Sequence, residues 1–514
     1  MNIEAATGSA SAVSTIFGLG SRPPDTVDGP FAAIRETHSG VVFLVADRAY
    51  KCKKPVDLGF LDFRDRQQRR DCCEREVKLN RRFAPDIYLG VAELMDPGSN
   101  TGEPLVLMRR MPDRQRLSTL IRSGKCSGDT IVRLGRMMAA FHAGADRSPE
   151  ISAEGSTDAI LRRWMASFEQ VAPVARDTIG VERAADIATR VQEFLAGRDS
   201  LFAQRVRAGR IIDGHGDLIC DDIFCLADGP RILDCLDFDD RLRYLDGLDD
   251  IAFLAMDLEK VGAPDLARLL LDQYADFAGD PAPSSLRHHY IAYRAFVRVK
   301  VDCVRYAQGD TSAAADAGAY AEIAVRHLRA GTVRMILVGG LPGSGKSTVA
   351  GLAADRLGAV LLSADRLRKE LNGLTPLARS PQPYGQGLYD AEHTTKTYDE
   401  LLRRAARLLG HGESVVLDAS WVSAKFRSAA ASIAERVHAR LIETKCWAPA
   451  QVRQTRLDAR RGGFSDADAH IAQQMANDAD PWPSAIRLNN SGTSEQALRQ
   501  LLERIEDVDR VSFE

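Results

Sequence analysis

The chain has 514 residues, which exceeds the size of one ordinary hydrophobic core, so two or three domains are expected. Hydrophobic residues make up 45% of the chain and charged residues 27%, a balance typical of soluble globular proteins. The net charge of -3 does not favour a broad basic surface, so nucleic acid is not an expected partner.

The chain begins with a segment of small and polar residues. Residues 1–29 are expected to form a partly ordered leader, and Arg22 is the first basic residue, so the basic start of a secretory signal is missing. No apolar run approaches the roughly 18–20 residues that cross a bilayer. The 9 cysteines show no metal-ligand spacing. These features predict a cytoplasmic protein with reduced thiols and no membrane partner.

The next segment, residues 30–329, is predicted to form one domain. Helical patterns of apolar residues dominate it from about Leu117 onward. The predicted elements are two strands in Val41–Lys54, an exposed helix in Arg64–Arg82, a strand in Glu103–Pro112 and helices from Leu117 onward, interrupted by two acidic motifs.

The acidic motifs are HGDLICDDIF, from His215 to Phe224, and ILDCLDFDD, from Ile232 to Asp240. Phosphoryl transfer requires a base at the attacking hydroxyl and acids that hold Mg²⁺. Asp217 is the candidate base. Asp222 and Asp237 are the candidate metal ligands, and the apolar residues around them are expected to anchor these acids on a hairpin.

The pattern changes near residue 330, where short apolar strands begin to alternate with helices. Such alternation predicts an α/β domain with a doubly wound parallel sheet. We therefore expect a second domain over residues 333–514. Its predicted strands lie in VRMILVGG (333–340), AVLLS (359–363), SVVLDASW (414–421) and RLIETKCWA (440–448).

A phosphate-binding loop is indicated by GLPGSGKS, which matches the pattern G-x-x-x-x-G-K-[ST]. Glycines allow backbone N–H groups to turn toward the phosphates, the lysine reaches the β- and γ-phosphates, and the Ser347 hydroxyl can bind Mg²⁺. The required strand before the loop and helix after it are both predicted. The expected nucleotide-binding residues are Gly340, Gly343, Ser344, Gly345, Lys346, Ser347 and Thr348.

Two further acids follow predicted strands of the second domain. Asp418 ends an apolar strand and is a candidate ligand of the Mg²⁺ shell; an ordinary turn residue is the alternative. Asp365 ends the second strand, at the edge of the sheet that faces the ligand in such folds. It is a candidate base, with Arg368 binding the acceptor, and a helix N-cap is the alternative.

These segments, GLPGSGKST, SADRLRKEL and VVLDASW, resemble small-substrate P-loop kinases: gluconate kinase, zeta-toxin-like kinases and polynucleotide 5′-kinases. The resemblance covers roughly residues 333–514. It implies that Asp365 is the base and that arginines of a lid helix hold the phosphates. Arg456 and Arg460 in RLDARR are the candidates for that lid, although a solvated basic helix face is an equal alternative. Arg427 is a further candidate for contact with substrate.

HGDLICDDIF and the motif after it resemble the aminoglycoside phosphotransferase and choline kinase branch of the α+β, two-lobed protein-kinase-like fold, over about residues 30–328. The resemblance implies a small lobe up to about residue 115 within the domain over residues 30–329. The resemblance implies a phosphate-binding lysine in AYKCKK with Glu76 as its helix partner. The alternation of side chains along a strand does not distinguish Lys51 from Lys53, because they are two residues apart. Lys51 is favoured because AYK is placed like the strand lysine of that fold. Asp222 departs from the family pattern, because it stands where Asn is usual and adds a negative charge beside ATP.

The whole chain resembles a family of bacterial two-domain proteins that fuse these two folds, with FLDFRDRQQRRDCCEREVKLNRRFAPDIYLGV as a typical segment. The resemblance implies an ATP- and Mg²⁺-dependent phosphotransferase with two nucleotide sites that transfers the γ-phosphate to a hydroxyl of a small molecule. One alternative is a non-catalytic, regulatory N-terminal half that controls a single P-loop kinase. Another is a P-loop kinase of nucleic-acid 5′ ends. The acceptor and the oligomeric state are not specified by the sequence.

Overall fold

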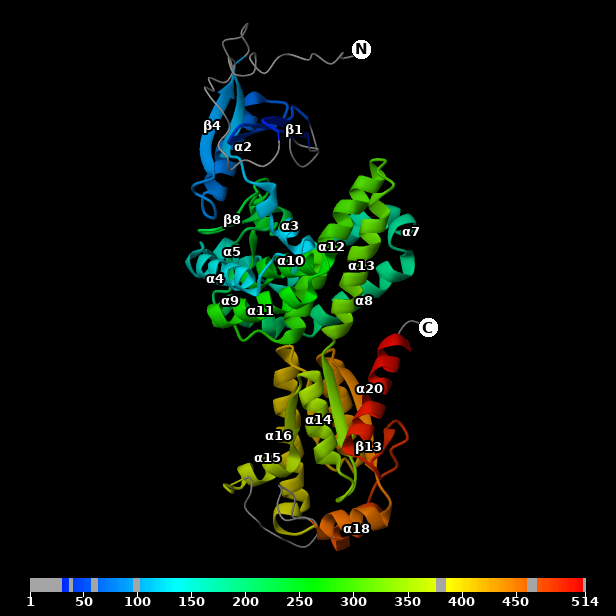
Figure 1. Ribbon diagram of the computed structural model, residues 1–514. Helices are drawn as coiled ribbons and strands as arrows, with labels where there is room; N and C mark the ends of the chain where they lie inside the picture. Colours follow the sequence, from blue (N-terminus) through cyan, green and yellow to red (C-terminus); the bar gives the residue numbers. More distant parts are fainter. Residues whose placement is uncertain are drawn as a thin grey trace. The chain divides into compact units, whose positions relative to one another are not determined.

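The computed structural model describes residues 30–36, 40–56, 63–95, 102–375, 385–459 and 469–511 (Figure 1). The leader expected over residues 1–29 lies outside this range. The described residues form two compact units. The first comprises the residues up to Met138, with His215–Arg243 and Asp257–Gln273, and the second comprises Ala139–Gly214, Tyr244–Met256 and the residues from Tyr274 onward.

The first unit contains an antiparallel sheet in the order β1-β2-β3-β5-β4, in which the predicted strands are present. Helix α2 (Arg66–Asn80) packs on this sheet through Cys73 and Val77, which share a buried cluster with Ile87 and Val106. The strands are β1 (Ala32–Glu36), β2 (Gly40–Val45), β3 (Arg48–Lys53), β4 (Tyr88–Leu94) and β5 (Glu103–Arg109).

The acidic motifs lie on a hairpin in the first unit. Strands β7 (Ile223–Leu226) and β8 (Gly229–Ile232) pair antiparallel, with Ile223 opposite Ile232. This register places Asp222 immediately before one strand and Asp234 shortly after the other. The backbone N–H of Leu233 donates to the carbonyl of Asp222 at 2.9 Å, which extends the pairing to the acids.

Most of the remaining first half of the chain is helical. Its helices are α3 (Leu117–Arg122), α4 (Gly128–Gly144), α5 (Pro149–Ala153), α6 (Thr157–Val171), α7 (Ala175–Thr178), α8 (Val181–Ala196), α9 (Asp199–Arg207), α10 (Gly247–Lys260), α11 (Pro264–Ala278), α12 (Ser284–Ala307) and α13 (Ala313–Ala330). Strands β6 (Ile211–Asp213) and β9 (Tyr244–Asp246) pair between them. In the second unit, Trp164 of α6 is fully buried and stacks on Phe168. Among the described helices, none is both long and apolar enough to cross a membrane.

The second unit also contains a parallel sheet in the order β11-β12-β10-β13-β14. The four predicted strands are present, and β14 was not predicted. The strands are β10 (Arg334–Gly339), β11 (Val360–Ser363), β12 (Val415–Asp418), β13 (Arg440–Trp447) and β14 (Ile486–Asn489). The domain boundary expected near residue 330 falls between α13 and β10, and it stays a prediction because the second unit runs across it.

Helices cover both faces of the parallel sheet. Ile336 and Val338 of β10 share a buried cluster with α14 (Lys346–Leu357) and α20 (Ser494–Val511). Met335 and Leu337, which point to the opposite face, are also fully buried. That face contacts α16 (Ala391–Gly410) and α17 (Ala424–Arg436). The remaining helices are α15 (Ala364–Leu371), α18 (Ala450–Asp458) and α19 (Ala469–Asn477).

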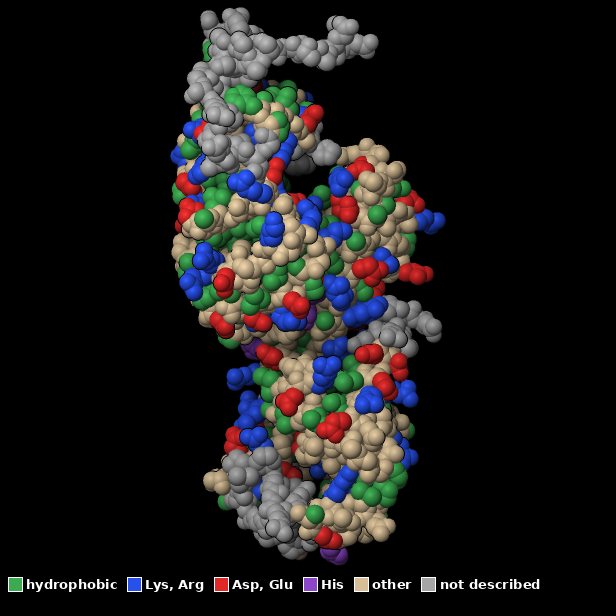
Figure 2. Space-filling view, viewed as in Figure 1, with side chains coloured by type: hydrophobic (Ala, Val, Ile, Leu, Met, Phe, Trp, Pro, Cys, Tyr) green, Lys and Arg blue, Asp and Glu red, His purple; other side chains and the backbone are tan. Residues whose placement is uncertain are grey.

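The surface carries both signs of charge. On the face that Figure 2 shows, Lys and Arg side chains are interspersed with Asp and Glu side chains instead of gathering by sign. The distribution on this face agrees with the near-neutral net charge.

Candidate functional site

One buried carboxylate in the first unit binds two lysines. Lys51 and Lys53 lie two residues apart on β3, so their side chains point to the same face of the sheet. Glu76 of α2 is 1% exposed, and its two carboxylate oxygens lie 2.9 Å from the Lys51 Nζ and 2.7 Å from the Lys53 Nζ. The three predicted residues therefore lie together, and each lysine forms an ion pair with one carboxylate oxygen of Glu76.

The second partners of the two lysines differ. Lys51 donates to Asp234 at 2.6 Å, whereas Lys53 donates to Asp237 at 3.2 Å. The sequence analysis did not single out Asp234. It has a backbone φ of 61°, a left-handed conformation that is uncommon for residues other than Gly and is often found at functional sites. The ion pair with Lys51 lowers the pKa of Asp234, so this acid is ionised at neutral pH.

Asp222 lies in a crowded group of acids. Burial raises the pKa of Asp222 well above its usual range, and the negative charges of Asp234 and Asp217 raise it further. A cation among these carboxylates would relieve that repulsion, and carboxylate oxygens are preferred ligands of Mg²⁺. The described residues contain no group of three or more His, Cys, Asp or Glu side chains placed to hold a metal ion by themselves. Two carboxylates of this group could hold Mg²⁺ only if the phosphates of a nucleotide supplied further ligands. The predicted ligand Asp237 instead lies beside Lys53, with the Cys72 Sγ at 3.6 Å.

The loop that carries Asp217 is held by His215. The Nε2 atom of this fully buried histidine lies 3.1 Å from the Leu233 carbonyl, and its Nδ1 atom accepts from the backbone N–H of Asp217 at 3.3 Å. These contacts require a neutral ring with its proton on Nε2. Gly216, between the two, has a φ of 85° that few other residues adopt. The loop thus ties Asp217 to the end of β8.

In the second unit, the loop after β10 requires glycine at three positions. Gly340, Gly343 and Gly345 have φ values of 140°, 77° and 80°, and a Cβ atom at each would lie 2.7, 2.6 and 2.2 Å from its nearest neighbour. At Gly345 that neighbour is the side-chain amide of Asn490. The same amide donates to the Ser344 carbonyl at 2.8 Å, so Asn490, which sequence reasoning missed, braces the loop.

Asp418 ends β12 beside this loop. It is 7% exposed, and its Oδ1 atom has no hydrogen-bond partner among the described residues. Burial raises the pKa of Asp418, while the charge of Lys346 and a hydrogen bond to Ser347 lower it. An unpaired buried oxygen beside a serine hydroxyl at the start of α14 fits a Mg²⁺ shell. Thr348, also expected at the nucleotide, follows on α14 and is exposed.

The predicted catalytic residues of this half line one cavity of about 480 Å³. Lys346, Asp365, Arg368 and Asp418 all belong to its walls. The Arg368 guanidinium donates to the Asp365 carboxylate at 2.7 Å. Asp365 lies inside the first turn of α15, whose N-cap is Ser363, so the helix-cap alternative for Asp365 is not found. The candidate base Asp365, the two cations Lys346 and Arg368 and the candidate metal ligand Asp418 therefore converge on one space.

The three other arginines have different outcomes. Arg456 of α18 lies beside the phosphate-binding loop, because its Nη1 atom would be 3.4 Å from a Cβ atom at Gly345. Arg460 lies outside the described residues. Arg427 was expected to contact substrate, and this expectation is corrected. It is buried, and it donates to the carbonyls of Trp421 at 2.6 Å and Pro481 at 2.7 Å, so its donors stabilise the fold.

Comparison with known proteins finds a family model that matches part of the second half and relatives that match both halves. A family model described as an AAA domain matches residues 335–481. An uncharacterized protein of Mycobacterium tuberculosis and one of Mycobacterium bovis are each 43% identical to the chain over 473 residues, which is 92% of this chain and 95% of theirs.

Solved structures resemble each half separately. A gluconokinase from Sinorhizobium meliloti is 16% identical and covers 34% of this chain and 93% of its own, with a TM-score of 0.26. An APS kinase of Mycobacterium tuberculosis, in complex with AMPPNP and APS, is 21% identical over 34% of this chain and 98% of its own, with a TM-score of 0.26. In the N-terminal region, a choline/ethanolamine kinase family protein from Mesorhizobium loti is 17% identical over 59% of this chain and 92% of its own, with a TM-score of 0.36. The description of each fold rests on the strand orders β1-β2-β3-β5-β4 and β11-β12-β10-β13-β14.

Proposed function

This chain belongs to the same family as the two mycobacterial proteins, and from that premise we propose that it is an ATP- and Mg²⁺-dependent phosphotransferase with two nucleotide sites. It transfers the γ-phosphate of ATP to a hydroxyl of a small molecule in the cytoplasm. Each half holds a lysine for the phosphates, a candidate base and candidate carboxylates for a metal, which are the parts that phosphoryl transfer requires.

The observation that carries this proposal is the 480 Å³ cavity at the phosphate-binding loop. Asp365 accepts the proton of the attacking hydroxyl, and Arg368 fixes the orientation of Asp365 and binds the acceptor. Lys346 stabilises the negative charge that develops on the transferred group. Ser347 and Asp418 would hold Mg²⁺, which supplies further charge neutralisation when bound.

In the first unit, Asp217 is the proposed base, and Lys51 is the lysine that binds the phosphates. Glu76 orients Lys51 at 2.9 Å. We assign the metal to Asp222 together with Asp234, because these carboxylates repel each other without a cation and Lys51 reaches Asp234. The predicted ligand Asp237 would then be a partner of Lys53.

One observation favours a second candidate function for this half. The raised pKa of Asp222 favours its protonated, uncharged form, so a metal ion and the nucleotide bound with it would have to displace that proton. A kinase-like half of this kind could bind a ligand and regulate the P-loop half without catalysis.

A nucleotide titration tests the number of sites. With a non-hydrolysable ATP analogue and Mg²⁺, the proposal predicts two equivalents bound to the wild type and one to either Lys51→Ala or Lys346→Ala. If the wild type binds one equivalent that Lys346→Ala abolishes and Lys51→Ala leaves intact, the first unit has no nucleotide site and the regulatory function replaces the proposed one. Retention of both equivalents in both variants would contradict both functions.

A further inference from the structure

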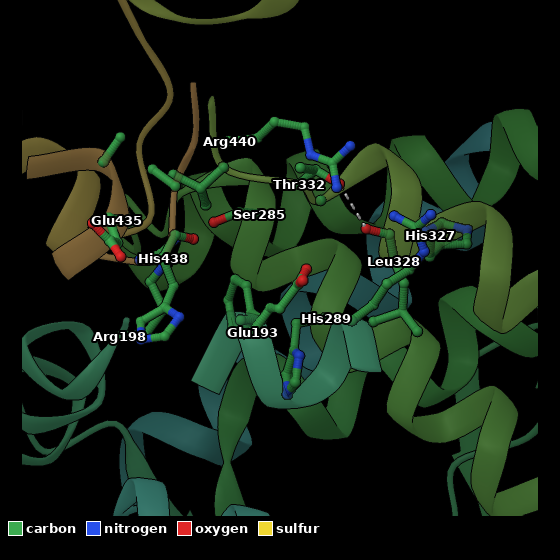
Figure 3. Close-up of a pocket in the computed structure, with 16 residues that line it drawn as sticks. Glu193, Arg198, Ser285, His289, His327, Leu328, Thr332, Glu435, His438 and Arg440 are labelled. Atoms are coloured by element: carbon green, nitrogen blue, oxygen red, sulfur yellow. Dashed lines mark hydrogen bonds between the residues drawn. The ribbon is translucent and has the colours of Figure 1, made fainter. Parts of the chain in front are cut away.

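A second cavity in the second unit lies away from the phosphate-binding loop. Its volume is about 350 Å³, and it is enclosed by α8, α12 and α13 on one side and by α17 and the start of β13 on the other (Figure 3). Strands β10 and β13 pair with Arg334 opposite Arg440 at the cavity end and with Gly339 opposite Lys445 at the loop end. The strands therefore separate the two places by roughly 17 Å.

Basic and imidazole side chains outnumber acids in the wall of this cavity. The acids are Glu193 and Glu435, and both are exposed, so solvent weakens their fields. The basic and imidazole lining consists of Arg190, Arg198, Arg440, His289, His327 and His438.

Arg198 is a buried cation without a carboxylate partner among the described residues. It is 1% exposed, and it donates to the carbonyls of Val437 at 2.7 Å and His438 at 3.3 Å, at the carboxyl end of α17. Burial lowers the pKa of Arg198 to about 10. Carbonyl dipoles at a helix end offset part of the cost of a buried charge. The Arg198 Nε atom has no hydrogen-bond acceptor within the part of the chain that the structure describes. An anion in the cavity would supply the missing counter-charge.

His289 offers a buried donor in the same wall. It is 2% exposed, and its Nε2 atom accepts from the Trp164 indole at 3.4 Å. Burial lowers the pKa of His289 to about 3, so the ring is neutral at pH 7 and its proton lies on Nδ1. That Nδ1 atom has no partner among the described residues. A buried donor without a partner is costly and indicates a missing acceptor.

We propose that this cavity is a binding site for a small organic oxyanion, a phosphate or a carboxylate attached to an apolar body, and that it is separate from both nucleotide sites. The oxyanion lies near Arg198 and Arg440. The apolar body packs against Phe194, Leu328 and Val333. The volume exceeds that of an inorganic ion and falls within the range of sites for small organic ligands.

Calorimetric titration of the full chain tests this site with two probes, phenyl phosphate and benzoate, which carry the same ring and a different anion. The Lys346→Ala variant serves as the background, because it weakens the competing phosphate site. In that background Arg440→Gln and Arg198→Met should each weaken the better probe about tenfold or more. Glu435→Gln should tighten it a few-fold. Arg403→Gln, an exposed arginine of α16, is the matched control and should have no effect.

The probe that binds more tightly identifies the preferred anion. Binding of either probe supports the site if the arginine variants weaken it and Glu435→Gln strengthens it. Circular dichroism and thermal unfolding establish that each variant is folded, and Arg440→Gln decides the outcome if Arg198→Met does not fold. The proposal is overturned if neither probe binds at millimolar concentration. It is also overturned if a probe binds with an affinity that Arg440→Gln and Glu435→Gln leave unchanged, because the probe then lies elsewhere.

Discussion

At the residue scale, the shared carboxylate of Glu76 distinguishes two lysines that look equivalent in the sequence. The Lys53 side chain is 6% exposed and is held by Glu76 and Asp237, whereas that of Lys51 is 19% exposed and points to Asp234. We interpret Lys53 as a structural cation and Lys51 as the one that meets the phosphates. Removing the more buried member of an ion-pair network leaves uncompensated charge in the interior.

This difference gives a paired prediction. Lys51→Met should weaken nucleotide binding to the first unit at least tenfold, because it removes the cation that meets the phosphates. It should lower the melting temperature less than Lys53→Met does, because Lys51 and its partner Asp234 are the more exposed members of the network. Lys53→Met should lower the melting temperature by several degrees, because it leaves part of the buried Glu76 charge unpaired. Nucleotide titration and thermal unfolding of the two variants measure both effects. If only Lys53→Met weakened nucleotide binding, Lys53 would be the phosphate-binding lysine and Lys51 the structural one.

Asn490 provides a second test at this scale. Its amide is fully buried and donates to the Ser344 carbonyl. Asn490→Ala would leave that carbonyl without its donor, at a cost of about 1–3 kcal/mol. We therefore expect roughly five- to 150-fold weaker nucleotide binding at the phosphate-binding loop, measured with a non-hydrolysable ATP analogue. Asn477→Ala, at an exposed position of α19, is the control. Equal affinity of the two variants would show that the amide does not brace the loop.

At the scale of elements, the sequence predicts those features that have a strong local pattern. The phosphate-binding loop and the strands around it are recognisable because an apolar run, glycines and a helix follow one another. Strand β14 (Ile486–Asn489) is short and half polar, and only pairing with β13 makes it a strand. Asp234 and Asp237 both follow the hairpin, and the sequence does not show which of them contacts Lys51. The structure shows that Lys51 contacts Asp234 and that Lys53 contacts Asp237. Arg427 was a candidate for contact with substrate, and its burial cannot be read from the sequence around a single arginine.

Helix α12 carries a pH-dependent contribution to stability through His289. Its pKa is about 3 in the folded state and about 6.5 in an unfolded chain. The unfolded chain therefore binds more protons between these values, so this contribution is complete above about pH 6.5 and is lost as the pH falls toward 3. Urea unfolding of the wild type and His289→Gln should show their difference in unfolding free energy shrinking by about 2 kcal/mol from pH 7 to pH 5. A difference independent of pH would mean that His289 is not buried as a neutral ring.

At the scale of the whole molecule, one chain contains an antiparallel sheet with its hairpin of acids and a parallel sheet with a phosphate-binding loop. The mycobacterial relatives match across 92% of this chain, so they span both halves. Each half has its own set of catalytic candidates, and the structure brings each set together within one unit. Sequence could predict these sets because each lies in a short motif. It could not predict the acceptor, because the walls of an acceptor site come from helices distant in the sequence.

The most direct test of the account is phosphate transfer from γ-labelled ATP in the presence of Mg²⁺ and a pool of small hydroxylated and amino-sugar metabolites. The account predicts labelled products with the wild type, one lost in Asp217→Ala and another lost in Lys346→Ala. A single product lost only in Lys346→Ala would leave the first unit as a regulatory module. The absence of any labelled product with the folded wild-type protein, or products that persist in both variants, would contradict the assignment of this chain as a phosphotransferase that uses these residues.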